Sequence, residues 1–490
     1  MRGLLASSVG VTCAAALALP LTSPAVAARP VSPAAVRPAS GAEAPGGTQS
    51  LPLAPLASRD FTLAPADEQG LPRRDVRHFS LAGVIWDDPD TELHGRVQIR
   101  TRAVGTDAWS GWQDLETHND DTADPGTAER TSGRVHGATA PLWVGDSDGV
   151  EVRVRAEADH RTEDMARGSR TATTTAPLPA GLRLELVDPG DSAPASTRQE
   201  AAAAGASHRA VALRSDPTPE PAEDPAAMDA SDPTAEPAED PAAMDASAAN
   251  AGLAAPGAIE IPALNRQQTE QELFALRAGE LTERQRTKPY IGPRPRIITR
   301  RGWGADERLR ERRFVYTKKS KAAFVHHTAS GNGYRCTQAP SLIRGIYRYH
   351  VKSRGWRDIG YNFLVDKCGN IYEGRAGGVA RPVLGAHTLG FNTNSVGIAV
   401  LGSYGSKKPP AAVTRAIARL TAWKLGLYGG NPRGKTYLKS GGGNRYPKGK
   451  KVRLNVISGH RDGFVTECPG RQLYRKLGST RTTAARLQGR

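Results

Sequence analysis

The segment Ala323-Phe-Val-His-His-Thr328 decides how the second half of this chain folds. Its apolar residues lead directly into two histidines, and a run this short and apolar is typical of a buried strand. Residues 396–401 read Val-Gly-Ile-Ala-Val-Leu and have the same character, while 340–350 and 411–425 have helical spacing. Strands that alternate with helices predict an α/β domain over residues 296–477, with a mixed central sheet flanked by helices.

Metal-binding side chains occur in this strand and in two later segments. His326 lies in the strand, His460 in Gly459-His-Arg-Asp462, and Cys468 in Glu467-Cys-Pro-Gly470. Two imidazoles and one thiolate make a tetrahedral zinc site with the fourth position left for water, which is a catalytic arrangement. A structural site would close all four positions with protein. The alternative is that each histidine ends a strand and Cys468 pairs with another cysteine.

The first residues are typical of an export leader. Arg2 precedes a mostly apolar stretch from Leu4 to Leu21, and Ala25-Val-Ala27 is a cleavage-site pattern. We therefore expect residues 1–27 to be a signal peptide and the mature chain to be secreted. The sequence after it contains no apolar run near the roughly 20 residues of a membrane span, so no integral membrane segment is predicted.

The cysteines bear on the zinc hypothesis. If Cys13 is removed with the leader, Cys336, Cys368 and Cys468 remain. A disulfide between Cys336 and Cys368 in an oxidising compartment would leave Cys468 as a lone thiol, for which metal ligation is an explanation. Pairing of Cys368 with Cys468 is the alternative, and the sequence leaves it open.

Charge is divided sharply along the chain. Residues 296–490 hold 39 Lys and Arg against 8 Asp and Glu, a net charge of +31, whereas the whole chain carries +16, so residues 1–295 carry −15. A field this positive concentrates acidic partners such as nucleic acid, an anionic membrane surface or an anionic wall polymer. No nucleic-acid motif accompanies the charge. For an exported protein we therefore expect association with the cell wall and no nucleic-acid partner.

Short runs with period-two alternation occur throughout the first half. They lie at 79–86, 97–100, 109–115, 142–144, 150–154 and 182–186. Separated by Gly, Asp and Pro, they predict an antiparallel β-sandwich over residues 60–188. Trp109 and Trp112 are either a glycan-stacking platform or core residues, and the core is the commoner place for aromatics in a small sandwich.

Polar, Pro-rich segments separate the predicted domains. Residues 28–59 are mostly Pro, Ala, Gly and Ser, which predicts no regular structure. Residues 189–295 predict an acidic linker in which a 16-residue unit starts at Ser215 and again at Ser231, followed by a short helix at 270–283. The other segments expected to lack regular structure are the Gly- and Lys-rich loop 435–451 and the basic C-terminal tail 478–490.

Six motifs occur in the second half in a fixed order. They are 301–305 (RGWGA), 324–329 (FVHHTA), 358–366 (DIGYNFLVD), 369–375 (GNIYEGR), 392–399 (NTNSVGIA) and 458–462 (SGHRD), the last continuing through Cys468-Pro469. In this order they resemble the peptidoglycan recognition protein and type 2 N-acetylmuramoyl-L-alanine amidase family, in its actinobacterial secreted form. The resemblance runs from about residue 296 to residue 477. The β-rich half resembles the companion region of such members only loosely.

The resemblance implies a zinc amidase. Its members cut the amide bond between the lactyl carbonyl of N-acetylmuramic acid and the L-alanine of the peptidoglycan stem peptide. By motif, His326, His460 and Cys468 are implied as the zinc ligands. His327 is then expected to point to the opposite face of its strand, since successive side chains alternate.

Two further residues are implied in catalysis. Tyr361 matches the tyrosine beside zinc in amidase members, and its hydroxyl can assist proton transfer or donate to the oxyanion. Thr466 matches a position beside the developing oxyanion. A recognition protein without catalysis would lack a zinc ligand or the tyrosine, whereas a stem-peptide endopeptidase would share the metal chemistry without the tyrosine motif.

A substrate groove is implied as well. The matching positions are His350, Arg354, Gly355 and Trp356 on one wall and His387, Asn392 and Thr393 on the other. In the family, a Gly-Trp pair at this place accompanies preference for diaminopimelate. Gly355 gives clearance and Arg354 can bind the additional carboxylate. The alternative for Trp356 is an ordinary packing residue.

Overall fold

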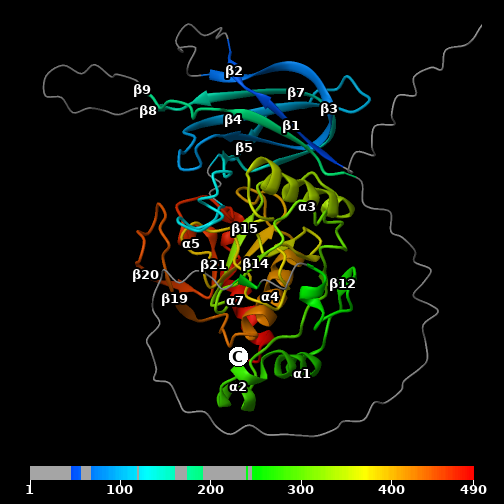
Figure 1. Ribbon diagram of the computed structural model, residues 1–490, viewed down its shortest axis with the longest axis vertical. Helices are drawn as coiled ribbons and strands as arrows, with labels where there is room; N and C mark the ends of the chain where they lie inside the picture. The colour runs from blue at the N-terminus through cyan, green and yellow to red at the C-terminus, as the bar shows by residue number, and fades with distance from the viewer. Residues whose placement is uncertain (1–45, 57–67, 118–120, 160–173, 191–238, 241–244) are drawn as a thin grey trace, which may run out of the picture. The chain divides into compact units, whose positions relative to one another are not determined.

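The structure is a computed structural model that describes residues 46–56, 68–117, 121–159, 174–190, 239–240 and 245–490 (Figure 1). The expected leader, the first copy of the 16-residue unit and most of the second copy lie outside these ranges. Within the described ranges, no helix is both long and apolar enough to cross a membrane.

Antiparallel strands form the N-terminal region, as the alternating runs predict. Eight strands make one hydrogen-bonded sheet in the order β1-β10-β3-β7-β4-β5, with β2 and β6 both paired to β3. Their bounds are β1 Gly47–Pro52, β2 Ala54–Pro55, β3 Glu68–Trp86, β4 Gly95–Ala103, β5 Gln113–Leu115, β6 Gly137–Ala138, β7 Leu142–Ala156 and β10 Arg183–Asp188. The register of β3 against β7 shifts at several points, as at β-bulges that bend a strand. The enclosed core includes Phe79, Val97 and Leu184.

This β-rich region begins earlier than predicted. β1 and β2 lie within residues 28–59, which the composition predicts to lack structure. β1 pairs with β10 from Gly47 opposite Asp188 to Pro52 opposite Arg183. A strand this short is completed only by a partner more than a hundred residues away, so local composition does not reveal it.

Trp109 and Trp112 are half-buried rather than core residues. The Arg73 guanidinium lies 4.8 Å from the Trp109 ring, and that of Arg153 lies 4.1 Å from the Trp112 ring. The ring faces are therefore in contact with arginine side chains.

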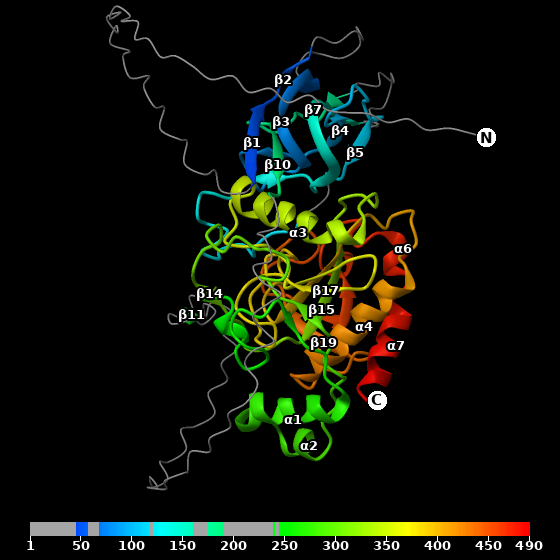
Figure 2. The same cartoon turned by 90° about the vertical axis from the view of Figure 1, so that its right-hand side faces the viewer.

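A mixed seven-stranded sheet forms the second region, in the order β12-β13-β17-β16-β18-β15-β21 (Figure 2). Its strands are β12 Glu260–Ile261, β13 Ile297–Ile298, β15 Ala322–His327, β16 Phe363–Val365, β17 Ile371–Glu373, β18 Ser395–Val400 and β21 Ile457–Gly459. Successive side chains alternate between two cores. Val396 and Ile398 of β18 pack with α4 (Ala411–Gly426), whereas Ala399 packs with α3 (Ala339–Arg348). The central sheet with helices on both faces confirms the predicted α/β architecture.

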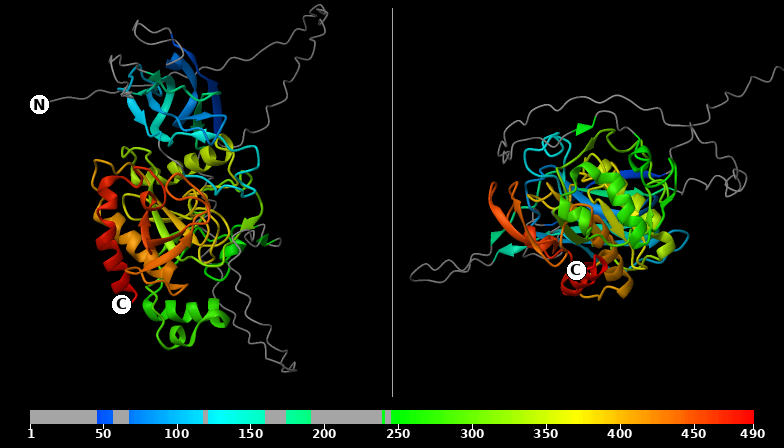
Figure 3. Two further views of the ribbon diagram at one scale, coloured as in Figure 1. Left: turned by 90° about the vertical axis from the view of Figure 1, so that its left-hand side faces the viewer. Right: turned by 90° about the horizontal axis from the view of Figure 1, so that it is seen from below.

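The two long predicted helices are confirmed, and a third was missed. α3 and α4 occupy the segments expected to be helical, and a π-helical turn, Tyr349–Ser353, follows α3. α7 (Leu477–Leu487) lies beside α4, where a basic tail was predicted (Figure 3). Ala484 and Ala485 of α7 are fully buried. Alanine and threonine dominate its buried face, so the apolar signal of this helix is weak.

The end of the predicted linker and the predicted loop 435–451 contain more regular structure than expected. The short helix expected at 270–283 is present as α1 (Arg266–Arg277), and a second helix, α2 (Glu283–Thr287), follows it. The predicted loop 435–451 is irregular from 440 to 450, but it is flanked by a paired β19 (Lys435–Lys439) and β20 (Lys451–Asn455), whose buried apolar side chains share a cluster with Phe324.

The β-rich region packs directly on α3. Leu81 and Val187 from its sheet share one apolar core with Leu342 and Ile346 of α3. Figures 1 and 2 both place α3 between the β-rich sheet and the mixed sheet. The described residues 46–490 therefore belong to one compact unit.

Candidate metal centre and groove

The three predicted metal ligands meet at the carboxyl ends of two parallel strands. Val325 of β15 pairs with Gly459 of β21, so the next residues, His326 and His460, lie side by side. His460 begins α5 (His460–Gly463), and Cys468 follows in the loop after that helix. Their candidate ligand atoms all lie within 4.8 Å of one another, and the three side chains are buried.

This donor set fits a zinc ion. His326 Nδ1 lies 3.8 Å from Cys468 Sγ, and the other nitrogen of the ring contacts Thr388 Oγ1 at 3.3 Å, which orients the imidazole. Both ring nitrogens of His460 are buried without a hydrogen-bond partner, which is costly unless a cation takes one of them. Burial raises the pKa of the Cys468 thiol, so its thiolate also requires a nearby cation.

His327 points away from this trio, as alternation along the strand predicts. Its Nδ1 accepts a hydrogen bond from the backbone N–H of Tyr404 at 3.2 Å, and its Nε2 lies 3.4 Å from Glu116. Its own backbone N–H donates to Cys468 Sγ at 3.4 Å. His327 therefore supports the thiolate position from the backbone and uses its ring elsewhere.

Tyr361 and Thr466 lie close to the trio. The Tyr361 ring centroid is 5.6 Å from that of His326. Burial, followed by the charge of Asp121, raises the pKa of Tyr361, so its hydroxyl stays a neutral donor. Thr466 is half-buried, and its Oγ1 accepts the backbone N–H of Cys468 at 3.2 Å.

Asp121 reaches the same place from the β-rich region, and sequence reasoning missed it. Its carboxylate is fully buried, with Oδ1 2.9 Å from His326 Nδ1 and 3.4 Å from His460 Nδ1. Oδ2 accepts the Tyr361 hydroxyl at 2.6 Å. Burial raises the pKa of Asp121, but the two imidazoles and the tyrosine lower it more, so it lies below its usual value. A sequence feature that could have pointed to Asp121 is the acidic stretch 120–129, which lies in the negatively charged half of the chain.

One predicted groove wall is an aromatic stack beside Tyr361. His350 lies in the π-helical turn, and its Nδ1 accepts the backbone N–H of Gly360 at 3.2 Å. Its ring centroid is 4.4 Å from that of Trp356, whose other neighbour is the Arg354 guanidinium at 4.2 Å. Trp356 is only 1% exposed, so it also packs, as the alternative interpretation held.

The opposite wall is built around Asn392. The Asn392 Oδ1 accepts the backbone N–H groups of His387 and Thr388 at 2.7 and 2.9 Å. His387 is fully buried, with Nδ1 3.0 Å from Thr388 Oγ1, and Thr393 is exposed beside the wall. The structure places the His350 ring centroid 5.6 Å from that of Tyr361 and the His387 ring centroid 5.3 Å from that of His326, so both predicted groove walls have a residue beside the site.

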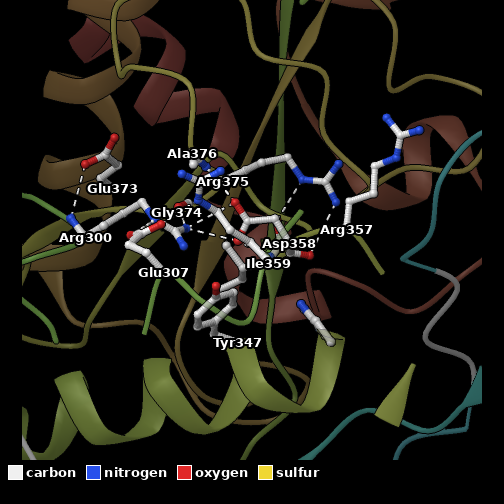
Figure 4. A network of polar contacts seen from close by, with 12 residues as sticks. Arg300, Glu307, Tyr347, Arg357, Asp358, Ile359, Glu373, Gly374, Arg375 and Ala376 are labelled. Atoms are coloured by element: carbon white, nitrogen blue, oxygen red, sulfur yellow. Dashed lines mark hydrogen bonds and ion pairs between the residues drawn. The ribbon is translucent and has the colours of Figure 1, made fainter. Parts of the chain in front are cut away.

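A buried ion-pair network holds the loop that leads into Tyr361 (Figure 4). Arg300 donates to Asp358 at 3.1 Å and to Glu307 at 2.7 Å. Asp358 also accepts the backbone N–H of Ala376 at 2.8 Å. Because Asp358 precedes the tyrosine by three residues, this network fixes the position of its side chain relative to the metal ligands.

A disulfide joins Cys336 to Cys368, with their Cα atoms 6.3 Å apart. Cys468 is the free cysteine of the described residues. Of the two pairings that the sequence left open, the structure contains the one that frees Cys468 for the trio.

Two family models match the chain. The N-acetylmuramoyl-L-alanine amidase model matches residues 316–471, and a model described as Rv3811 N-terminal galactose-binding domain-like matches residues 33–179. Peptidoglycan-recognition protein SC2 of Drosophila simulans is 34% identical over 188 residues, which are 37% of this chain and 84% of the relative. The chain belongs to the peptidoglycan recognition protein and type 2 amidase family.

A second curated relative and a solved structure are also similar to this chain. Peptidoglycan recognition protein 1 of Bos indicus is 34% identical over 188 residues, 36% of this chain and 80% of the relative. A solved structure of wild-type Drosophila PGRP-LB is 27% identical, with TM-score 0.30, and covers 37% of this chain and 92% of its own. The amidase family model and the curated relatives confirm the family resemblance of the second half, and the model that matches residues 33–179 is described as galactose-binding domain-like.

Proposed function

We propose that this chain is a secreted, cell-wall-associated, zinc-dependent N-acetylmuramoyl-L-alanine amidase. Its substrate is peptidoglycan, and it hydrolyses the bond between the lactyl carbonyl of N-acetylmuramic acid and L-alanine of the stem peptide. The observation that carries this proposal is the placement of Tyr361 beside a buried His326, His460 and Cys468 trio. A binding function alone requires the groove but neither the trio nor the tyrosine.

The residues of the site have separate roles in amide hydrolysis. Bound zinc would supply a Lewis acid that polarises the amide carbonyl and lowers the pKa of water. Tyr361 donates its neutral hydroxyl to the carbonyl oxygen as negative charge develops on it, and the Thr466 hydroxyl supplies a second donor. Thr388 and the backbone N–H of His327 hold an imidazole and the thiolate in place. Burial excludes bulk water, which strengthens each of these interactions.

We infer that the substrate carries diaminopimelate-type stem peptides. Arg354 would supply a cation for the additional carboxylate of diaminopimelate, and the missing side chain of Gly355 would leave space for it once the Arg134 carbonyl, which lies against Gly355, has moved away. The strongly positive second half attracts anionic wall polymers in addition. Recognition without cleavage is the second candidate, because the curated relatives are named as peptidoglycan-recognition proteins.

Substitution of Tyr361 by phenylalanine tests the proposal. We expect Tyr361→Phe to bind diaminopimelate-type peptidoglycan as the wild type does, but to release stem peptides about 10²–10³-fold more slowly, the usual cost of one oxyanion donor. Released peptides are identified by mass spectrometry and should begin with L-alanine. A chelator should abolish release from the wild type.

Tyr437→Phe is the matched control, because Tyr437 is 51% exposed on β19. It should cleave at the wild-type rate. Equal rates for Tyr361→Phe and the wild type, or products cut at another bond, would contradict the assigned mechanism.

A further inference from the structure

The groove contains a segment of the chain itself. Residues 121–136 connect β5 and β6 of the β-rich region and lie between the two walls. Ala123 and Val135 from this segment form one buried apolar cluster with Trp356 and Ala386. The aromatic wall that would face a stem peptide is therefore covered by aliphatic side chains of the same chain.

The opposite wall is bonded to the same segment. Asn392 Nδ2 donates to the carbonyl of Thr122 at 2.9 Å and to Asp124 Oδ1 at 2.7 Å. The backbone N–H of Gly390 also donates to Asp124 Oδ1, at 2.7 Å. These are the donors that a bound peptide with carbonyl and carboxylate groups would require.

The clearance at Gly355 is also filled. Gly355 has φ 74°, and a Cβ atom built on it would lie 1.9 Å from the Arg134 carbonyl oxygen. The backbone N–H of His136 donates to the Arg354 carbonyl at 3.2 Å. The space assigned to the substrate is thus taken by backbone of the β-rich region.

A carboxylate in the segment is bound as a substrate carboxylate would be. Glu129 accepts two hydrogen bonds from Arg375, both at 2.8 Å, and the backbone N–H of Arg357 at 3.0 Å. Glu129 and Arg375 are both buried. A bidentate, buried pair of this kind holds the segment firmly, since removing either partner leaves an uncompensated charge.

We infer that residues 121–136 are an intramolecular inhibitor that closes the groove, and that Asp121 is a displaceable fourth zinc ligand. Asp121 Oδ1 faces both histidines of the trio, and a carboxylate oxygen is an ordinary zinc donor. Four protein ligands close a zinc site, whereas catalysis needs one open position. Opening requires Asp121 to leave and the segment to move out of the groove. The inhibition rests on the proposed amidase function, while occupation of the groove does not.

The first experiment measures whether the metal site has an open coordination position. The full-length wild type and Asp121→Ala are loaded with Co²⁺ and titrated with azide, and the visible absorption bands are recorded. We expect azide to change the spectrum of Asp121→Ala at concentrations that leave the wild type unchanged. Asp114→Ala is the control, because Asp114 is an exposed carboxylate on β5 that pairs with Arg96. If Asp121→Ala does not fold, Asp121→Asn, which keeps the shape but is a weaker ligand, replaces it.

The second experiment measures ligand binding to the groove independently of catalysis. The affinity for a muramyl tripeptide that ends in diaminopimelate is measured by calorimetry for Tyr361→Phe and for Tyr361→Phe combined with Asp121→Ala. A competitor tethered in the same chain lowers apparent affinity by the fraction of time for which it occupies the site. We expect the double variant to bind at least about 10-fold more tightly, and Asp121→Ala alone to hydrolyse peptidoglycan faster than the wild type.

The outcomes separate this inference from the amidase proposal. The inference would be overturned if azide bound equally well to the wild type and to Asp121→Ala. It would also be overturned if Tyr361→Phe and the double variant bound the tripeptide with equal affinity. Slower hydrolysis by Asp121→Ala without azide binding would also overturn it, because Asp121 would then belong to the catalytic machinery. Tighter tripeptide binding without hydrolysis by any variant would uphold closure of the groove and reject the amidase.

Discussion

Cys468→Ala is expected to retain no zinc after dialysis and to lose peptidoglycan hydrolysis by more than about 10³-fold, beyond the cost of a single oxyanion donor. The thiolate is the one soft donor of the trio, and its sulfur lies 3.8 Å from His326 Nδ1. Removing it leaves two imidazoles, too few ligands for a catalytic zinc site. Metal content is measured by atomic emission, and cleavage by release of stem peptides.

The same loss should follow from His460→Ala, because neither ring nitrogen of His460 has a hydrogen-bond partner in the described structure. His94→Ala is the matched control, because the His94 side chain is 55% exposed in the β-rich region. It should keep one zinc ion per chain and full activity. Full zinc occupancy in Cys468→Ala would show that the metal site lies elsewhere.

Arg300→Ala is expected to lower the free energy of unfolding by about 3–5 kcal/mol, the usual cost of breaking a buried ion pair from one side. The Arg300 side chain is 2% exposed and donates to Asp358, Glu307 and the carbonyl of Gly374 (Figure 4). Without it Asp358 stays buried with no cation bonded to it, whereas Glu307 keeps Arg310 at 2.5 Å. Urea unfolding followed by tryptophan fluorescence measures the change.

Arg308→Ala removes a guanidinium from the same part of the chain and serves as control. The Arg308 side chain is 72% exposed and pairs with Asp306 at the surface, so its loss should cost less than about 1 kcal/mol. Equal losses for both variants would show that the Arg300 network adds nothing beyond a surface pair.

The meeting of His326, His460 and Cys468 was predictable because each residue lies in a short motif with its own local signal. His326 and His460 follow strands whose apolar character is visible in the sequence, and the pairing of those strands brings the two rings together. Asp121 was not predictable in this way. Its position depends on how the β-rich region packs on α3, and no local pattern of one region records the packing of another.

The same distinction, between a local sequence signal and contacts distant in sequence, applies to the helices and strands. α4 and β18 have strong periodic signals and were found with nearly correct bounds. β1 is held by β10, and α7 has a buried face of small side chains. The hairpin of β19 and β20 is rich in lysine, yet it is completed by cross-strand pairing and by burial of Leu438. Each of these elements is stabilised by contacts distant in sequence.

The apolar contact between the β-rich sheet and α3 bears on how the proposed amidase could be activated. Leu81, Ile85 and Val187 on one side and Leu342 and Ile346 on the other are almost fully buried. Such a contact holds two fragments together without a covalent connection. A protease that nicks the chain between residues 190 and 245 would therefore yield a noncovalent pair that still carries Asp121 in place. If residues 121–136 inhibit the proposed amidase, backbone cleavage in the connecting stretch would not activate it, and activation would require a ligand or a mechanical force that separates the β-rich sheet from α3.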